Sequence, residues 1–306
     1  MRLRNLEIKD AEKMLSWMKD LKVNCFFRFD SSNIHIEDCI NFIEKSKNNN
    51  SNLHLAIVND DDEYMGTISL KNIDSVEKSA EYAIVICREN QGKGIAKYAT
   101  IRILDIAFNR YKLNTVYLNV LENNIHAKTF YEKFGFLYEG KEYNAFKRTT
   151  VNIQGKEVLL DWYSISKEVY NNNYLYWQID FHELGDERGK LVVAESFGKI
   201  PFNIKRIFYI YGSDYDVIRG QHANKNSEFV LINVAGSCEV KVDTGKKEQI
   251  FYLNKPNKGL YINKMVWKDM YNFSKDSVLL VLSNTVYDAK EYIRDYDTFK
   301  NIIKEN

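Results

Sequence analysis

Long apolar runs are missing from this 306-residue sequence, and so is any surplus of charge of one sign. A membrane-spanning helix needs about 20 consecutive, predominantly apolar residues, and no stretch of the chain provides them. The formal net charge is +1, which gives no general attraction to nucleic acid or to a membrane surface. Residues 1–10 carry charges where a signal peptide would be apolar. We therefore expect a cytoplasmic protein that binds neither nucleic acid nor membrane.

Cysteine, histidine and proline are also scarce, with four, five and two residues. The cysteines (Cys25, Cys39, Cys87 and Cys238) form no C-x-x-C pair, so we expect reduced, buried thiols rather than a metal or redox centre. What the chain does contain is 45% hydrophobic and 28% charged residues, enough for a normal core. Its length suggests one large domain or two ordinary ones.

The first half of the sequence alternates between strand and helix patterns. Asp10 can cap a helix with Met14, Leu15 and Met18 on its apolar face. An acidic turn at 60–63 joins two strand patterns into an antiparallel hairpin. The predicted elements are a helix near 36–43, strands at 53–59, 65–71 and 80–87, a helix at 94–111, a strand at 115–121, a helix at 124–134 and two closing strands.

The second half reads differently. An asparagine run at 171–173 favours a turn or linker, which places the seam of the chain at 167–173. After it come short strands separated by glycine, asparagine and aspartate turns, and then a helix at 292–303. Strands at this spacing predict a β-sandwich or small barrel. The predicted strands are 191–195, 207–211, 229–234, 238–242, 249–253 and 278–282.

A glycine-containing turn lies between the strand at 80–87 and the helix that follows it. Its residues are Gln91, Gly92, Lys93, Gly94, Ile95 and Ala96. Glycine lets the backbone approach a ligand closely, and amide N–H groups converge at a helix N-terminus, an arrangement that suits a pyrophosphate. Such a turn alone could equally be a tight connection without a ligand.

The helix predicted at 124–134 carries a second motif, Asn124-x-x-Ala127-x-x-x-Tyr131-x-x-x-Gly135-Phe136. The order of glycine loop, strand and this helix resembles the GNAT N-acetyltransferase superfamily, and in particular its branch that acetylates ribosomal-protein N-termini and nucleotide-linked amino sugars. The resemblance implies an α+β domain over residues 1–168, with a mixed, mostly antiparallel sheet, flanking helices and acetyl-CoA as cosubstrate.

The same resemblance implies roles for individual residues. Amides from the glycine loop would hold the CoA pyrophosphate, and Asn124 would contact the cofactor arm. Tyr131 would protonate the leaving thiolate, which a phenol can do because it is protonated at neutral pH; the alternative is a packed helix tyrosine. A backbone N–H on strand 81–87 would stabilise the oxyanion. Glu81 would receive the amine's proton, or else is a surface residue, and His126 is expected on the surface.

A second resemblance covers residues 175–304. The segments that carry it are 181–191, 200–211, 217–225, 259–261, 266–270 and 292–297. They look like the dTDP-4-keto-6-deoxyglucose 3,4-ketoisomerases, which are metal-free enzymes of the all-β cupin (jelly-roll) fold. The resemblance implies a cupin domain over 175–306, a homodimer formed through it, and a site for thymidine diphosphate sugar. Arg206, Arg219 and Tyr209 are the candidate contacts to diphosphate or sugar.

This half departs from the family at two polar positions. The family usually has His-Ala-His where this chain has His222-Ala223-Asn224, and the second histidine is the one that shuttles protons. Asparagine does not titrate near neutral pH. The family also usually has histidine or arginine where Lys268 follows the tryptophan. We therefore favour a cupin that binds the dTDP-sugar without isomerising it; an active isomerase with His222 as base and a purely dimerising scaffold are the alternatives.

The two resemblances together suggest one pathway. The isomerase family acts on the route to 3-amino-3,6-dideoxyhexoses, where a ketone is isomerised, transaminated and then N-acetylated. The sequence thus predicts an enzyme that acetylates a dTDP-3-amino-3,6-dideoxyhexose for O-antigen (lipopolysaccharide) or other surface-glycan biosynthesis. The galacto or gluco configuration of the sugar stays open.

Overall fold

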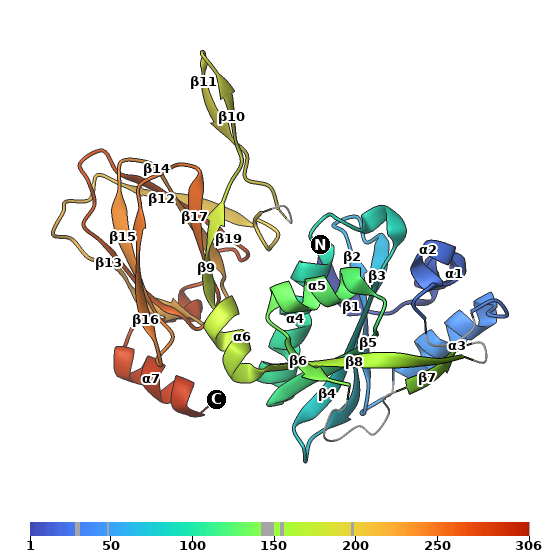
Figure 1. Ribbon diagram of the computed structural model, residues 1–306. Coiled ribbons are helices and arrows are strands. Elements are labelled where there is room, and N and C mark those ends of the chain that lie inside the picture. The colour runs from blue at the N-terminus through green and yellow to red at the C-terminus, as the bar shows by residue number, and fades with distance from the viewer. Residues whose placement is uncertain (28–30, 48, 142–149, 154–155, 197–198, 306) are drawn as a thin grey trace. The chain divides into compact units, whose positions relative to one another are not determined.

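The chain divides into two compact units, Met1–Tyr170 and Asn171–Asn306 (Figure 1). A computed structural model describes all residues except 28–30, 48, 142–149, 154–155, 197–198 and 306. The predicted seam lies at this division, but the turn expected at the asparagine run is wrong. Residues Lys167–Tyr174 form helix α6 instead, because Tyr170 buries its ring beside Phe108 of the first unit and holds the segment in a helix.

The first unit is built on one eight-stranded sheet with the order β1-β2-β3-β4-β5-β8-β6, to which β7 adds by pairing with β8. Every neighbouring pair is antiparallel except β4 and β5, which run parallel. The strands are β1 (Arg2–Asn5), β2 (Leu53–Val58), β3 (Tyr64–Asp74), β4 (Ser79–Ile86), β5 (Thr115–Leu121), β6 (Leu137–Gly140), β7 (Thr150–Ile153) and β8 (Lys156–Ser166). This confirms the predicted mixed, mostly antiparallel α+β domain.

Helices cover both faces of this sheet. They are α1 (Ala11–Lys19), α2 (Leu21–Asn24), α3 (Ile36–Ser46), α4 (Ile95–Asp105) and α5 (Ile125–Phe134), with short 3-10 turns at Ile8–Asp10 and Arg88–Asn90. α1 and α3 bury Met14 and Ile43 in one cluster, against which Val85 of β4 packs. Tyr82 of β4 faces the other way and bonds Thr100 of α4 through its hydroxyl. Alternation along β4 thus separates an α1/α3 face from an α4/α5 face.

Two details of the predicted helices change. The helix expected to run to residue 111 is α-helical only to Asp105 and continues as a π-helical turn over Ile106–Arg110. Asp10 stands at the N-terminus of α1 but makes no side-chain cap there. Its carboxylate instead accepts hydrogen bonds from Arg4 and from the Glu7 amide, because the half-buried guanidinium of Arg4 offers a stronger, charge-assisted partner.

The second unit contains two five-stranded antiparallel sheets, β12-β19-β14-β17-β9 and β16-β15-β18-β13-β20, and a separate hairpin β10–β11 that projects from them (Figure 1). The strands are β9 (Tyr176–Asp180), β10 (Glu183–Asp186), β11 (Gly189–Val192), β12 (Arg206–Tyr211), β13 (Arg219–Asn224), β14 (Phe229–Ala235), β15 (Cys238–Asp243), β16 (Glu248–Leu253), β17 (Lys258–Ile262), β18 (Trp267–Tyr271), β19 (Val278–Ser283) and β20 (Tyr292–Ile293). The predicted β-sandwich is confirmed. The C-terminal helix α7 begins at Tyr296, four residues late, because Tyr292 and Ile293 pair with β13.

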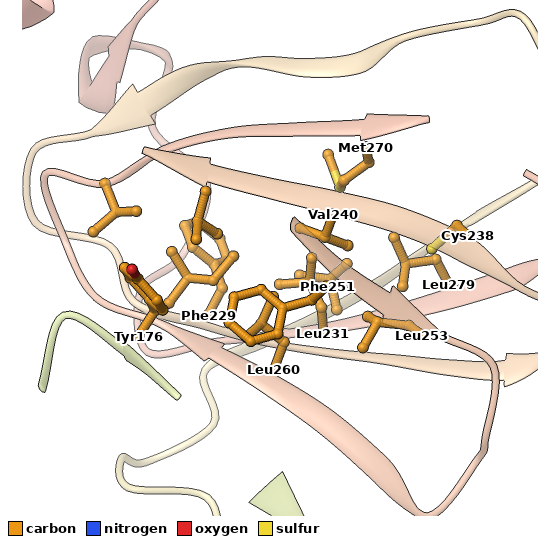
Figure 2. Close-up of a cluster of buried hydrophobic side chains, with 14 of the residues drawn as sticks. Tyr176, Phe229, Leu231, Cys238, Val240, Phe251, Leu253, Leu260, Met270 and Leu279 are labelled. Atoms are coloured by element: carbon orange, nitrogen blue, oxygen red, sulfur yellow. The ribbon is translucent and has the colours of Figure 1, made fainter. Parts of the chain in front are cut away.

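An apolar core fills much of the space between these two sheets (Figure 2). Leu231 and Leu260 come from one sheet, Val240 and Met270 from the other, and all are buried. Burying a side chain of this size contributes about 1.5–3 kcal/mol. This core stabilises the sandwich. Inward positions of β13, β14 and β18 that lie outside it carry polar residues.

Candidate functional sites

The glycine loop connects β4 to α4 in the conformation that its sequence demands. Gly92 and Gly94 have φ values of 76° and 77°, a left-handed region that other residues enter at a cost. A Cβ at either position would meet no atom within 4 Å, so backbone conformation and not crowding requires glycine. Gln91 ties the loop to β4 by donating from Nε2 to the Ile86 carbonyl at 3.1 Å.

The N-terminus of α4 is open to a ligand. Gly94 is its N-cap residue and supplies no capping side chain, while the first-turn amides of any α-helix have no intrahelical acceptor. Residues 91–94 are exposed. Converging N–H groups and the positive end of the helix dipole suit a phosphate group. These residues therefore fit the CoA pyrophosphate.

Strands β4 and β5 separate beside this loop. Their pairing covers only Ser79–Glu81 and Thr115–Tyr117, although β4 extends to Ile86 and β5 to Leu121. Beyond Glu81, no ladder joins these two described strands. Main-chain donors and acceptors there are consequently available to a ligand, as on a sheet edge. The gap lies on the predicted oxyanion strand.

Tyr131 of α5 faces the α4/α5 side of the sheet. Its ring meets that of Tyr82 edge-on at 6.0 Å and also contacts Phe136. Burial raises the pKa of Tyr131 above its usual range. No hydrogen bond reaches its hydroxyl from the part of the chain that the structure describes. A protonated phenol without a protein partner is what a proton donor to a bound ligand requires.

Helix α5 is held in place at its start by two contacts. Asn124, its N-cap, accepts a hydrogen bond at Oδ1 from the Ala127 amide at 3.2 Å. Lys128 forms an ion pair with Asp161 of β8 at 2.5 Å, and Tyr138 donates to the same buried carboxylate. Sequence reasoning missed Asp161, because an isolated aspartate within a strand gives no signal before its partner is known.

Glu81 and Tyr131 lie on opposite sides of the sheet. Glu81 precedes Tyr82, the residue that contacts Tyr131, so its side chain points to the other face of β4. Both of its oxygens already accept hydrogen bonds, from Lys71 at 2.7 Å and from Asn72 at 3.2 Å. Glu81 could accept the amine's proton only across the strand gap or through water. His126 is exposed, as expected.

A second group of polar residues meets inside the cupin unit. His222 of β13 stands directly opposite Lys268 of β18, and Lys268 shares its inward face with Met270 of the core. The Lys268 ammonium donates to Asn224 Oδ1 at 2.6 Å and lies 4.6 Å from the centre of the Phe229 ring. The structure thus brings together His222, which keeps the family pattern, with Asn224 and Lys268, which depart from it.

Burial dominates the electrostatics of this cluster. Lys268 is 4% exposed and Asn224 1%, and desolvation lowers the pKa of Lys268 to about 7 against the opposing charge of Asp269. Burial, followed by the charge of Lys268, lowers the pKa of His222 to about 4. His222 Nδ1 lies 2.7 Å from the Gly220 carbonyl, which fixes that nitrogen as the N–H donor. Asn224 Nδ2 is buried and makes no hydrogen bond to any described residue.

The three candidate contacts for the nucleotide do not share one face. Arg206 shares one face of β12 with Phe208 and Ile210, and Ile210 packs on the inner core. The buried Nε of Arg206 has no hydrogen-bond partner among the described residues. Tyr209 points outward and is 62% exposed. Arg219 is exposed and donates from Nε to Ser213 Oγ at 3.3 Å. Arg206 and Tyr209 therefore lie on opposite faces of β12.

Tyr292 was missed as a member of the interior cluster. Its ring meets the His222 imidazole edge-on at 4.7 Å, because β20 pairs with the end of β13. No local pattern in the sequence indicates this two-residue strand. The described residues contain no group of three metal-ligating side chains placed to hold an ion, and none of their helices is long and apolar enough to cross a membrane.

Comparison with known proteins assigns each unit to a family. Residues 176–304 match the family model FdtA, described as WxcM-like, C-terminal, and residues 1–137 match that of the GNAT acetyltransferase domain. The chain is 44% identical over 125 residues to the TDP-4-oxo-6-deoxy-alpha-D-glucose-3,4-oxoisomerase of Aneurinibacillus thermoaerophilus, over 41% of this chain and 90% of that protein.

Two further relatives each match one part of the chain. The spermidine N(1)-acetyltransferase of Vibrio cholerae is 40% identical over 76 residues, which are 25% of this chain and 44% of that enzyme; the chain thus spans less than half of that relative's length. A solved TDP-fucose-3,4-ketoisomerase from Campylobacter jejuni is 53% identical, covering 42% of this chain and 94% of that one, with a TM-score of 0.40. The chain belongs to the WxcM-like family of TDP-sugar 3,4-ketoisomerases through its cupin unit, which is fused to an N-terminal GNAT acetyltransferase domain.

Proposed function

We propose that the first unit transfers the acetyl group of acetyl-CoA to the amine of a dTDP-3-amino-3,6-dideoxyhexose. The fusion carries this proposal: a domain of the amine-acetylating GNAT class shares one chain with a domain of the TDP-sugar ketoisomerase family. A sugar amine attached to the same nucleotide links the two. The product would serve O-antigen or other surface-glycan assembly.

The chemistry follows from the residues of the first unit. Acetyl-CoA, when bound, supplies a thioester carbon that an uncharged amine can attack. Amides of the glycine loop from Gly92 to Ala96 hold the pyrophosphate, and Gln91 keeps the loop attached to β4. Asn124 orients the helix that meets the cofactor arm. Unpaired N–H groups of β4 stabilise the oxyanion as it forms.

Two proton transfers complete the reaction. As the C–S bond breaks, Tyr131 gives its phenolic proton to the departing thiolate and is reprotonated from solvent. The amine loses one proton as the C–N bond forms. Glu81 receives it through water across the gap between β4 and β5, because its oxygens face the far side of the sheet.

For the cupin unit we propose binding of the dTDP-sugar without isomerisation by a histidine pair. Arg206, Arg219 and Tyr209 are the proposed nucleotide or sugar contacts, and His222, Asn224 and Lys268 surround the sugar. Asn224 cannot carry a proton where the family's second histidine does. A bifunctional acetyltransferase and 3,4-ketoisomerase is the second candidate, and the contact between Lys268 and Asn224 favours it.

We also propose a homodimer formed through the cupin unit. The outward face of edge strand β12 exposes Ile207, Tyr209 and Tyr211 by 61%, 62% and 68%. Three large apolar or aromatic side chains in a row on an edge strand are typical of an interface. The proposed contact of Tyr209 with the nucleotide or sugar would then lie next to this interface.

Acetyl transfer with a panel of acceptors tests the main proposal. The purified full chain with acetyl-CoA should turn over dTDP-3-amino-3,6-dideoxyhexoses, assayed in both galacto and gluco forms by release of free thiol. Spermidine and an N-terminal ribosomal-protein peptide are the controls and should react at least about 100-fold more slowly. A site built to hydrogen-bond a substrate's polar groups discriminates by more than this factor against molecules that lack them. Preferred turnover of spermidine, or no turnover of either sugar, contradicts the proposal.

A further inference from the structure

The interior of the cupin unit holds a lysine that structural needs do not explain. Lys268 is 4% exposed, and no carboxylate forms an ion pair with it in the part of the chain that the structure describes. A buried cation without a counter-charge is costly, and a protein commonly escapes that cost by keeping the amine neutral. Residues held in this way are concentrated at functional sites.

The surroundings of Lys268 form a set of donors with spare capacity. Its ammonium uses one hydrogen bond, to Asn224 Oδ1 at 2.6 Å, out of the three that it can donate. Asn224 Nδ2 is buried and has no hydrogen-bond partner among the described residues. His222, opposite Lys268 across the strand pair, has Nδ1 engaged by the Gly220 carbonyl. Such a set fits an oxygen-rich ligand that carries a ketone or a hydroxyl group.

We propose that Lys268, oriented by Asn224, is the proton carrier of the cupin unit and exchanges a proton at the carbon beside the ketone of a bound keto sugar nucleotide. This inference rests on the second candidate function, the bifunctional enzyme, and names the residue that would carry the proton where the second histidine is missing. Asn224 is then a positioning residue: its Oδ1 directs the amine and its Nδ2 donates to the sugar oxygen.

The step balances without a co-reactant. The neutral amine of Lys268 takes the proton from the hydroxyl-bearing carbon next to the ketone, so that a C–H bond breaks and an N–H bond forms. The electron pair becomes the C=C bond of an enediolate, whose oxygen accepts a hydrogen bond from Asn224 Nδ2. The ammonium then returns a proton to the former carbonyl carbon, while the enediol O–H loses its proton to the other oxygen. The ketone has moved by one carbon.

The environment of the amine is compatible with both of its protonation states. Burial lowers the pKa of Lys268 to about 7, so neutral amine and ammonium coexist at neutral pH. The charged or titratable groups that act on the cluster are His222 on β13, Asp269 on β18 itself and Arg294 after β20. His222, with its pKa lowered to about 4, stays neutral and adds no competing charge.

Hydrogen exchange in heavy water tests this proposal with dTDP-4-keto-6-deoxyglucose as the probe and without acetyl-CoA. The full chain should replace the hydrogen at C3 by deuterium, seen as loss of its proton NMR signal and a mass gain of about one unit per deuterium. Lys268→Met should lower the exchange rate by at least about 100-fold, the lower range of general acid–base catalysis. Lys275→Met, at an exposed lysine of the same unit, should leave it unchanged.

The remaining outcomes separate the alternatives. Lys268→Arg keeps a buried cation that cannot become neutral, and it should abolish exchange even if Lys268→Met fails to fold. Calorimetry with dTDP checks that both variants still bind. No exchange by the wild-type chain, or exchange that Lys268→Arg preserves and His222→Gln removes, overturns the proposal. None of these results affects acetyl transfer to the amino sugar, which is measured separately.

Discussion

The two units place their chemistry in opposite kinds of environment. In the acetyltransferase unit the proposed cofactor site is exposed and consists mainly of main-chain groups, namely the glycine loop before α4 and the unpaired edges of β4 and β5. In the cupin unit the proposed sugar site is enclosed and consists of side chains, with Lys268 and Asn224 almost fully buried. We propose that the first kind of site recognises its ligand through main-chain geometry and that the second acts through side chains whose pKa values are lowered by burial.

This difference explains what the sequence could and could not predict. The glycine loop is six consecutive residues, so its conformation and its donors are local properties that a motif reveals. The interior cluster of the cupin unit joins β13, β14, β18 and β20, and its character depends on burial, which no local pattern encodes. The sequence identified Asn224 and Lys268 as departures, but only the fold shows that they contact each other.

The same contrast holds for the fold. The long strands of the first unit and the strands with clear apolar alternation in the second were predicted within a few residues. β13 and β18 were not, because His222, Asn224 and Lys268 replace the apolar residues by which an inward face is recognised. Glu81 was assigned to the site from its strand alone, and only the face alternation with Tyr82 shows that it lies on the opposite side from Tyr131.

The largest expected effect concerns Tyr131, the proposed proton donor of the acetyltransferase unit. Tyr131→Phe should lower kcat for acetyl transfer by about 100-fold, because the thiolate then leaves without a proton. The melting temperature should hardly change, since the hydroxyl has no partner within the described part of the chain. Steady-state kinetics and a thermal melt measure the two quantities.

A matched control comes from a tyrosine with a structural role. Tyr170 is fully buried, and its hydroxyl donates to the Ile101 carbonyl at 3.3 Å. Tyr170→Phe should lower stability by about 1 kcal/mol and leave kcat unchanged. Full activity in Tyr131→Phe, or equal effects of both variants, would show that Tyr131 is only a packed side chain.

The next effect is a pH dependence expected for deuterium exchange by the cupin unit. Because burial sets the pKa of Lys268 at about 7, the neutral fraction of the amine grows about tenfold between pH 6 and pH 8, and deuterium exchange should grow with it. If His222 were the base, its pKa of about 4 would make exchange independent of pH over this range. Exchange rates in buffers from pH 5 to 9 distinguish the two. Lys268→Arg should leave the pH profile of acetyl transfer as it is.

The smallest effect tests the claim that main-chain geometry makes the first site. Gly94→Ala places a Cβ in open space, so its whole cost comes from a φ of 77°, about 1 kcal/mol for a residue other than glycine. If the loop relaxes to avoid this cost, its amides no longer converge, and KM for acetyl-CoA should rise about fivefold, the equivalent of that energy. Gly212→Ala is the matched control, because Gly212 has a φ of 63°, equally open space and a place in the cupin unit. It should cost the same stability with no change in KM, and a KM that responds equally to both variants would mean that the loop does not bind the cofactor.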